Sequence, residues 1–344
     1  MTATLDRSIP AGAVKPQLKD VIKSLPKACF QKSRRRAWQR VALSVGAVLL
    51  GYGAIALSPW FLLPFAWFFT GTALTGFFVI GHDCGHRSFA RQRWLNDLVG
   101  HTLMMPLIYP FHSWRLLHDH HHKTTNQTYI DNAWQPWTEE DYANASPFIQ
   151  GGYRLFRQGL WWLSSIIHWA GYHFDPKEVA PRHRSQVRFS IAVVIGFAAV
   201  FFPTLIWATG WWGLVKFWVM PWLGFHFWLS TFTLVHHTLP EIQFRPVGEW
   251  DAYEAQVQGT VHCRYPRWIE ILCHDINVHI PHHVSTAIPS YNLAIAHRSL
   301  QQHWGHDMIE RRFSWQLMQD ITRECHLYHP QRAYQRFSEF RRQR

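Results

Sequence analysis

Charged residues are scarce in this chain. Lysine, arginine, aspartate and glutamate together make up only 16% of its 344 residues, against roughly 25% in an average soluble domain. Between Val41 and His82 none of the four occurs. This uncharged run of about forty residues is twice the length that a helix needs to cross a bilayer. The scarcity of charge therefore disfavours an ordinary soluble protein and favours an integral membrane protein.

Paired cysteines are also lacking. The chain has five cysteines, and none of them forms a CxxC pair. Their odd number and wide spacing predict reduced thiols in a protein that faces the cytosol, rather than a disulfide framework. Cys84 lies inside a histidine motif described below, and we expect it to be an inert buried thiol, with thiolate ligation of a metal as the alternative.

A secretory signal is the third absence. Residues 1–20 contain no apolar segment behind a basic start, so no signal peptide is expected and this segment is predicted to be a polar tail.

The apolar residues form two candidate hairpins. In the first, Ser58–Trp60 is the expected turn within residues 41–82. The second consists of Phe189–Ala208 and Trp212–Val235, separated by the sequence TGW, and Lys216 is its only formal charge. The 20 tryptophans of the chain also fit a membrane, because tryptophan is enriched at membrane interfaces. We predict four transmembrane helices; buried core helices of a large soluble protein are the alternative.

The basic residues predict the orientation. The net charge of +12 could indicate nucleic-acid binding. The lysines and arginines, however, avoid both hairpin tips and gather on the opposite side, which predicts contact with an anionic membrane surface, no nucleic acid, and cytoplasmic termini. Two stretches are too short or too mixed to span: Leu98–Tyr109 is expected to be a re-entrant or interfacial segment, and Tyr153–Trp169 a helix lying in the interface. The expected organisation is a polar and basic cytosolic segment (1–40), a transmembrane hairpin (41–82), a cytosolic segment with interfacial helices (83–188), a second transmembrane hairpin (189–237) and a cytosolic segment with a basic tail (238–344).

Histidine is abundant, with 24 residues, and its spacing is specific. The pattern HxxxH occurs three times, and its second and third copies also carry the HxxHH pattern. On a helix, positions i, i+3 and i+4 share a face, so each motif can aim its imidazoles at one point. Pro281, inside the third motif, is acceptable if that motif begins a helix. We refer to these motifs as the first box (His82 and His86), the second box (His118, His121 and His122) and the third box (His279, His282 and His283).

The three boxes can meet on one side of the membrane. The first box follows the second predicted span, and the third box follows two further spans, so all three lie at the cytoplasmic surface. Eight imidazoles exceed what one zinc ion takes, and two irons suit the number better, although imidazole alone does not separate iron from manganese or copper. His120 is expected to point away from the shared face of the second box. The predicted fold is thus an all-α membrane protein whose four transmembrane helices form two hairpins under a cytosolic helical cap that holds a histidine-rich dimetal site.

The boxes and their flanks resemble the membrane fatty-acid desaturases, from about Arg40 to Ser299. The segments GHDCGHRSFARQRWLNDLVGH, MMPLIYPFHSWRLLHDHHHKTTN and HIPHHVSTAIPSYNL are similar to those of cyanobacterial acyl-lipid Δ12 (omega-6) desaturases, and less similar to those of the ω3 enzymes. The residues between and after the second-box histidines depart from the family pattern, which bears on the position of the double bond rather than on metal binding.

The resemblance implies a non-haem di-iron centre that uses O2 and two electrons to insert a cis double bond into the acyl chains of membrane glycerolipids. It implies the eight box histidines as ligands, and a further ligand at the end of the fourth span, where His236 and His237 are available and alignment favours His237. Asp83 and Asp119 lie within the boxes and could orient imidazoles; solvated or helix-capping carboxylates are the alternative. The chain has no HPGG-type cytochrome b5 segment, so the expected electron donor is a separate protein, by resemblance a reduced [2Fe–2S] ferredoxin docking on the basic face.

Two other functions fit part of the pattern. Hydroxylases and carotenoid oxygenases share the three-box plan and differ in the product. A membrane metal transporter or sensor is an alternative of a different class. It should carry histidines near the middle of the bilayer, where His226 is the only histidine well inside a predicted span. The implied location is a multi-pass protein of the plasma membrane, the thylakoid membrane or both, if the source is cyanobacterial.

Overall fold

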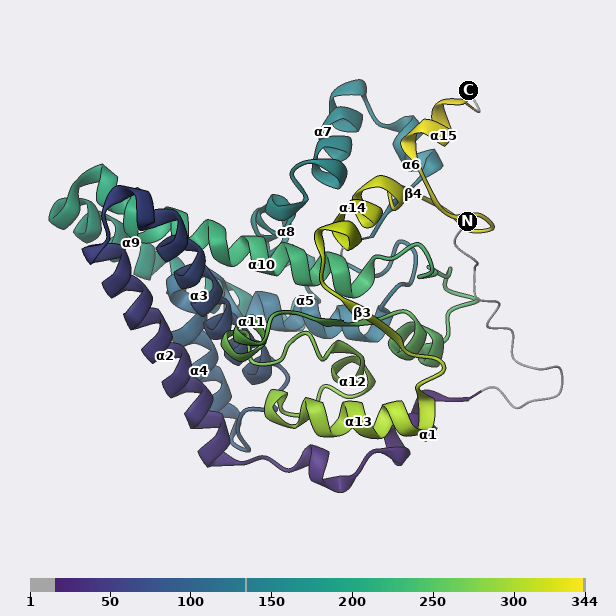
Figure 1. Ribbon diagram of the computed structural model, residues 1–344, viewed down its shortest axis with the longest axis horizontal. Coiled ribbons are helices and arrows are strands. Elements are labelled where there is room, and N and C mark those ends of the chain that lie inside the picture. Colours follow the sequence, from purple (N-terminus) through teal and green to yellow (C-terminus); the bar gives the residue numbers. More distant parts are fainter. Residues whose placement is uncertain (1–15, 134, 343–344) are drawn as a thin grey trace.

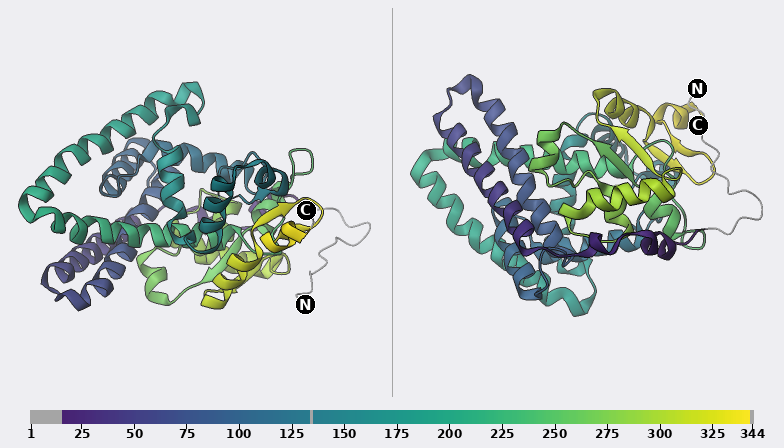
Figure 2. Two further views of the ribbon diagram at one scale, coloured as in Figure 1. Left: turned by 90° about the horizontal axis from the view of Figure 1, so that it is seen from above. Right: turned by 60° about the horizontal axis from the view of Figure 1, so that its bottom comes forward.

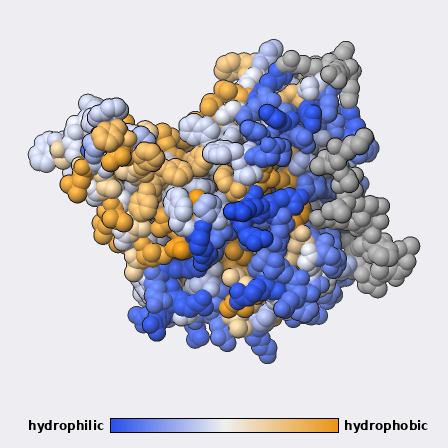
Figure 3. All heavy atoms as spheres, in the orientation of Figure 1, coloured by the Kyte–Doolittle hydropathy of each residue, from blue (hydrophilic) through white to orange (hydrophobic). Residues whose placement is uncertain are grey.

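The computed structural model describes residues 16–133 and 135–342, and most of these residues are helical. Long apolar helices extend to one end of the molecule, and shorter helices and strands form a cap at the other (Figure 1). In the space-filling view apolar residues gather over the long helices and hydrophilic residues over the cap (Figure 3). The polar tail predicted for residues 1–20 lies largely outside the described residues.

The first apolar run forms two helices. Helix α2 (Arg34–Leu57) begins behind Ser33, whose hydroxyl accepts a hydrogen bond from the Arg36 amide, as an N-cap does. After the short 3₁₀ turn η2 (Trp60–Leu62) the chain returns as α3 (Leu63–Gly85). The reversal thus lies at the predicted turn. Most of the apolar surface of α2 is exposed, whereas α3 is largely buried against its neighbours.

The second apolar run is one helical stretch that reverses in its middle. Helix α9 (Arg184–Leu214) contains Gly210 at φ 69°, a conformation that favours glycine. The stretch continues through the π-helical turn η7 (Val215–Val219) into α10 (Met220–His237), and α9 and α10 meet at an angle (Figure 2). The bend lies inside the predicted TGW turn. The described residues contain three helical stretches long and apolar enough to cross a membrane, and this is the longest of them.

Helix α10 packs directly on α3. The two backbones touch at Gly71 and Gly224, where a Cβ built on Gly71 would lie 2.6 Å from the Gly224 Cα. Such close approach through small residues is typical of helices packed within membranes. The contact holds the first box, at the end of α3, beside the end of α10.

The segment between the hairpins is helical but more broken than predicted. The interfacial helix expected over Tyr153–Trp169 is in fact α7 (Pro147–Gln158), a break at Gly159, the turn η4 (Trp161–Leu163) and α8 (Ser164–Tyr172). Glycine ends α7 because it is a poor helix former, and Ser165, whose amide donates to the Ser230 hydroxyl of α10, fixes the new direction. The other elements of this segment are α4 (Arg93–Met104), η3 (Met105–Leu107), α5 (Phe111–Thr124), β1 (Trp137–Thr138), α6 (Glu139–Asn144), η5 (Pro176–Glu178) and η6 (Pro181–His183).

Short strands in the cap correct the purely helical prediction. Strands β1, β4 and β5 form one sheet, and β2 and β3 pair in parallel in another. Each strand has two to four residues, too few to leave a periodic pattern in the sequence. The remaining elements are α1 (Leu18–Ser24), η1 (Lys27–Phe30), η8 (Glu254–Gln258), β2 (Val261–Arg264), α11 (Arg267–Leu272), α12 (His279–Val284), η9 (Ser290–Asn292), α13 (Leu293–Trp304), β3 (Ile309–Arg312), α14 (Trp315–Glu324), β4 (Leu327–His329), β5 (Ala333–Gln335) and α15 (Phe337–Arg342).

All five cysteines are free and buried, as the prediction of reduced thiols requires.

Candidate metal centre

The first box lies where α3 ends. His82 is in the last turn of α3, and His86 follows it as the C-terminal cap. The two residues are one helical turn apart, so their rings pack against each other with the centroids 4.7 Å apart. The structure therefore presents the first pair of imidazoles at the end of a buried helix.

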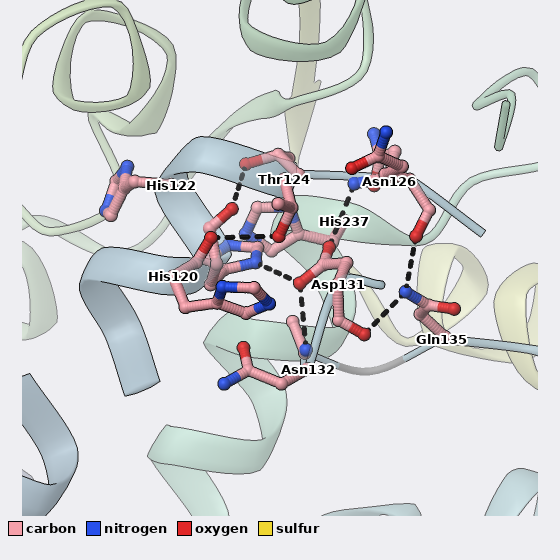
Figure 4. Close-up of polar contacts among 12 residues, drawn as sticks. His120, His122, Thr124, Asn126, Asp131, Asn132, Gln135 and His237 are labelled. Carbon is pink, nitrogen blue, oxygen red and sulfur yellow. Dashed lines mark hydrogen bonds and ion pairs between the residues drawn. The ribbon is translucent and has the colours of Figure 1, made fainter. Parts of the chain in front are cut away.

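The second box divides its imidazoles between two faces of α5. His118 and His122 share one face, and their Nε2 atoms lie 3.1 Å apart. His121 occupies the neighbouring face and is buried. His120 points outward, and its Nε2 donates to the backbone oxygen of Ile130 at 2.9 Å (Figure 4). The prediction that His120 leaves the shared face is thus confirmed.

The third box begins a helix, as the proline within it requires. Helix α12 begins at His279, so Pro281 lies in its first turn, where the missing N–H has no intrahelical partner to lose. His279, His282 and His283 are all buried.

The boxes converge into two groups of imidazoles. Within each group the candidate donor atoms lie within 4.8 Å of one another. Contacts between boxes are close: His82 Nε2 lies 3.0 Å from His282 Nε2. The first group consists of His82, His86, His118, His122 and His282, and the second of His121, His237 and His283.

The second group includes a histidine from the end of α10. His237 Nε2 lies 2.9 Å from His279 Nε2, so His279 borders the second group without being one of its three members. The neighbouring His236 is also buried, but its ring stacks on His279 at 4.3 Å and it belongs to neither group. Of the two adjacent histidines, the geometry thus brings His237 into the cluster.

Burial favours the neutral form of five of the box imidazoles. Desolvation, reinforced by neighbouring imidazoles, holds the pKa values of His118, His122, His279, His282 and His283 well below the usual range. A neutral imidazole is the form that binds a metal ion. Among the described residues, His86 Nε2 and His283 Nε2 are buried without a hydrogen-bond partner. Converging imidazole nitrogens, some of them without a hydrogen-bond partner, fit a metal ion better than a hydrogen-bonded core.

The distances between facing nitrogens also fit metal binding. Three facing pairs of Nε2 atoms lie 2.9–3.1 Å apart, close to the separation of two ligands at right angles around one ion with bonds of about 2.1 Å. Two separate groups correspond to two ions.

Two polar residues that the sequence did not reveal support the second group. Asp131 Oδ1 accepts a hydrogen bond from His121 Nδ1 at 2.7 Å, and the Asp131 side chain is buried (Figure 4). Gln256 Oε1 accepts from His283 Nδ1 at 2.8 Å. Both contacts fix the ring orientation and leave Nε2 for a metal. Asp131 lies in the loop after α5 and Gln256 in η8, so no local spacing connects them to the boxes.

The carboxylates inside the boxes are less direct. Asp119 Oδ1 lies 3.5 Å from His86 Nδ1, and the Asp119 side chain is 35% exposed. Asp83 Oδ1 lies 3.6 Å from His82 Nδ1, while its Oδ2 accepts from the Ser290 amide at 3.1 Å. Both carboxylates lie beside imidazoles that they could orient, but at distances longer than those of strong hydrogen bonds.

A cavity of about 800 Å³ reaches the imidazoles. It extends between α3, α5, α8 and α10, and both groups contribute to its wall. Its lining is mainly apolar and aromatic, including Phe78, Val79 and Leu229. A mainly apolar space bordered by clustered imidazoles can hold a long hydrocarbon chain against them.

Comparisons with known proteins agree with a site that holds a hydrocarbon chain. A family profile described as fatty acid desaturase matches residues 58–315. The sn-1 oleoyl-lipid 12-desaturase of Synechocystis sp. is 58% identical, covering 95% of this chain and 93% of the relative. The protein of the same name from Anabaena variabilis is 60% identical, over 94% and 93%. The chloroplastic omega-6 fatty acid desaturase of Brassica napus is 50% identical, over 92% of this chain and 71% of the relative.

Proposed function

The chain belongs to the fatty acid desaturase family, and on that premise we propose that it inserts a cis double bond at Δ12 of oleoyl chains at the sn-1 position of membrane glycerolipids. The names of its cyanobacterial relatives support this substrate. The observation that carries the proposal within the molecule is the mainly apolar cavity bordered by both imidazole groups. The same names support desaturation over hydroxylation.

Two irons are the proposed cofactors. The first would be held by His82, His86, His118, His122 and His282, and the second by His121, His237, His279 and His283. When bound, they would supply the O2-dependent oxidation of an unactivated methylene, which no acidic or basic side chain can perform. Imidazole ligands are compatible with iron.

The protein itself positions the substrate. Phe78, Val79 and Leu229 line the cavity beside the imidazoles, and their apolar surfaces would hold the acyl chain and exclude water. Asp131 and Gln256 would keep His121 and His283 turned toward the metal through their Nδ1–H hydrogen bonds. The depth at which the chain is held would determine which carbons reach the metals.

The membrane arrangement that we propose has four spans in two hairpins, with the termini and the site on the cytoplasmic side. Support comes from exposed tryptophans at both hairpin tips: Trp60 at the first, and Trp207 and Trp211 at the second. Tryptophan favours the membrane–water interface. The two tips would therefore lie at the same, non-cytoplasmic interface, in the plasma membrane or the thylakoid membrane.

The proposed electron donor is a reduced [2Fe–2S] ferredoxin. Its support is the net charge of +12, since an acidic donor is steered to a basic surface.

Gas chromatography–mass spectrometry tests the proposal directly. The chain is expressed in a host that makes oleate, lacks Δ12 activity and supplies ferredoxin. We expect linoleate from the wild type and none from His121→Ala. The matched control is His120→Ala, which removes an adjacent imidazole that faces away from both groups and should preserve linoleate formation.

Other products would overturn parts of the proposal. A double bond elsewhere would retain the desaturase and refute the Δ12 position. A hydroxylated chain would favour the oxygenase alternative. Membrane-inserted, metal-loaded protein that produces no new lipid would refute the acyl substrate or the donor.

A further inference from the structure

A second pocket, of about 450 Å³, lies outside the proposed active site. It shares no lining residue with the cavity that reaches the imidazoles. Its walls come from the first turns of α2, from β2 and α11, and from α13. The charged residues among its lining are Arg36, Arg40, Arg264, Arg267, Glu270, Asp275 and Arg298.

The pocket has a surplus of positive charge. Its two carboxylates are already paired, since Asp275 binds Arg40 at 2.8 Å and Arg267 at 2.9 Å, and Glu270 binds Arg267 at 3.1 Å. The other three arginines form no ion pair within residues 16–133 and 135–342. Arg36 donates only to neutral oxygens of Tyr291 and Asn292. The surplus favours an anionic ligand.

One donor in the wall has no acceptor. Arg40 Nη1 is buried and lacks a hydrogen-bond partner among the described residues, although Arg40 Nη2 is bound to Asp275. Leaving a buried donor of a charged group unsatisfied is costly. Arginine is well suited to phosphate oxygens, and a small movement of the guanidinium would bring Nη1 within reach of an oxygen of a bound anion.

The surroundings of the pocket are those of a membrane interface. Leu43 is exposed on the face of α2 that carries Arg36 and Arg40, and Trp268 and Ile271 are exposed on α11. The two helices contact each other. Arginines flanked by exposed tryptophan and aliphatic side chains match the level of lipid headgroups, with acyl chains beyond them.

A metal ion is the less suitable occupant. His262, His297 and Glu310 lie close enough together to hold a cation, and both histidines line the pocket. However, Glu310 Oε1 already lies 3.2 Å from His297 Nε2 and accepts a hydrogen bond from Gln301 at 2.7 Å. The excess of arginine over carboxylate also repels a cation.

We propose that this pocket binds the phosphate headgroup of an anionic membrane glycerolipid, with the acyl chains lying along α2 and α11. This proposal rests on the crossing of the membrane by α2 that is proposed above. This lipid would stay bound to the protein and would not be the substrate, because the pocket is separate from the cavity that reaches the imidazoles.

Lipid retention tests the site. The full chain is purified into nanodiscs of phosphatidylcholine and phosphatidylglycerol, exchanged into neutral detergent, and analysed for bound lipid by native mass spectrometry. The test variant is Arg264→Gln with Arg298→Gln, since both side chains are exposed and form no ion pair in the described part of the chain. The matched control is Arg188→Gln with Arg323→Gln, two exposed arginines outside the pocket with the same loss of charge.

We expect phosphatidylglycerol to be bound about fivefold more weakly for each arginine lost, or roughly 25-fold for the pair, from the usual contribution of one arginine near an anionic surface. The control should retain it like the wild type. Equal retention in all three proteins, or equal loss in both variants, would overturn the proposal.

Two further outcomes would identify a different occupant. If inorganic phosphate alone displaces the lipid from the wild type, the pocket is a free-anion site. If the test variant keeps its lipid but loses binding to an acidic electron-transfer protein, the pocket is a protein docking site. Desaturation by the wild type is measured in the same preparation, so that a failure of the lipid-binding proposal can be distinguished from a failure of the proposed reaction.

Discussion

At the scale of single residues, the most consequential contact is that between Asp131 and His121. The carboxylate is buried and also accepts hydrogen bonds from the backbone amides of Asn126 and Ala133 at 2.9 Å. It therefore fixes both the imidazole and the loop after α5. Partners of this kind are worth about 10- to 100-fold in metal affinity or activity.

We predict that Asp131→Asn lowers desaturase activity by about 10- to 100-fold and lowers the metal content of the second group. The reason is the loss of the charged acceptor that orients His121. Metal per chain, measured by elemental mass spectrometry on folded protein, is the readout alongside activity. Asp119→Asn is the matched control, because that carboxylate is more exposed and farther from its imidazole; an equal effect of both substitutions would contradict the prediction.

The adjacent His236 and His237 provide a second prediction. His237→Gln should reduce activity by more than about 100-fold and remove metal, because a direct ligand costs more than a residue that orients one. His236→Gln should leave the metal content near the wild-type value, since His236 only stacks on His279. Metal loss from the His236 variant with retention in the His237 variant would reverse the assignment.

At the scale of helices, the site depends on how closely α3 and α10 approach. Gly71 and Gly224 allow the backbones to touch, and the two helices end in His82 and His237. Any widening at the glycine contact therefore separates the two groups of imidazoles.

We predict that Gly71→Ala lowers the free energy of unfolding by about 1–3 kcal/mol, the usual cost of overpacking. Thermal unfolding of detergent-solubilised protein, with metal content as a second readout, measures the effect. Gly46→Ala serves as the control: Gly46 lies in α2, a Cβ added there would meet nothing within 4 Å, and the substitution should be neutral or slightly stabilising. Equal melting temperatures for the Gly71 variant and the wild type would refute the packing argument.

The helices also show which features of the site could be predicted from the sequence and which could not. The boxes were predictable because positions i, i+3 and i+4 of a helix must share a face, whatever the rest of the chain does. The division of the second box between two groups was not, because it depends on how α5 is rotated against α3 and α12. Gln256 and Asp131 reach the site only through tertiary packing. The break at Gly159 was missed because its apolar neighbours continue the helical pattern across it.

At the scale of the whole molecule, the net charge should affect how fast the electron donor associates with the protein. Long-range attraction to a net charge of +12 is screened by salt. We predict that the apparent second-order rate constant with reduced ferredoxin falls at least about tenfold between low ionic strength and roughly 0.5 M salt, where the Debye length is only a few Å.

Turnover with a saturating donor is the control for this prediction and should change little, since docking is then no longer limiting. A rate constant independent of salt would mean that the basic face does not steer the donor.

The division of α5 and α12 between the two groups has a consequence for metal loading. Each of these helices supplies imidazoles to both groups, His118 and His121 from one, His282 and His283 from the other. Capture of the first ion would fix the rotation of both helices and so pre-form the second site before an ion arrives. Uptake should therefore be cooperative: at half the full complement of iron, the population would consist mainly of empty and doubly loaded molecules, with few carrying a single ion.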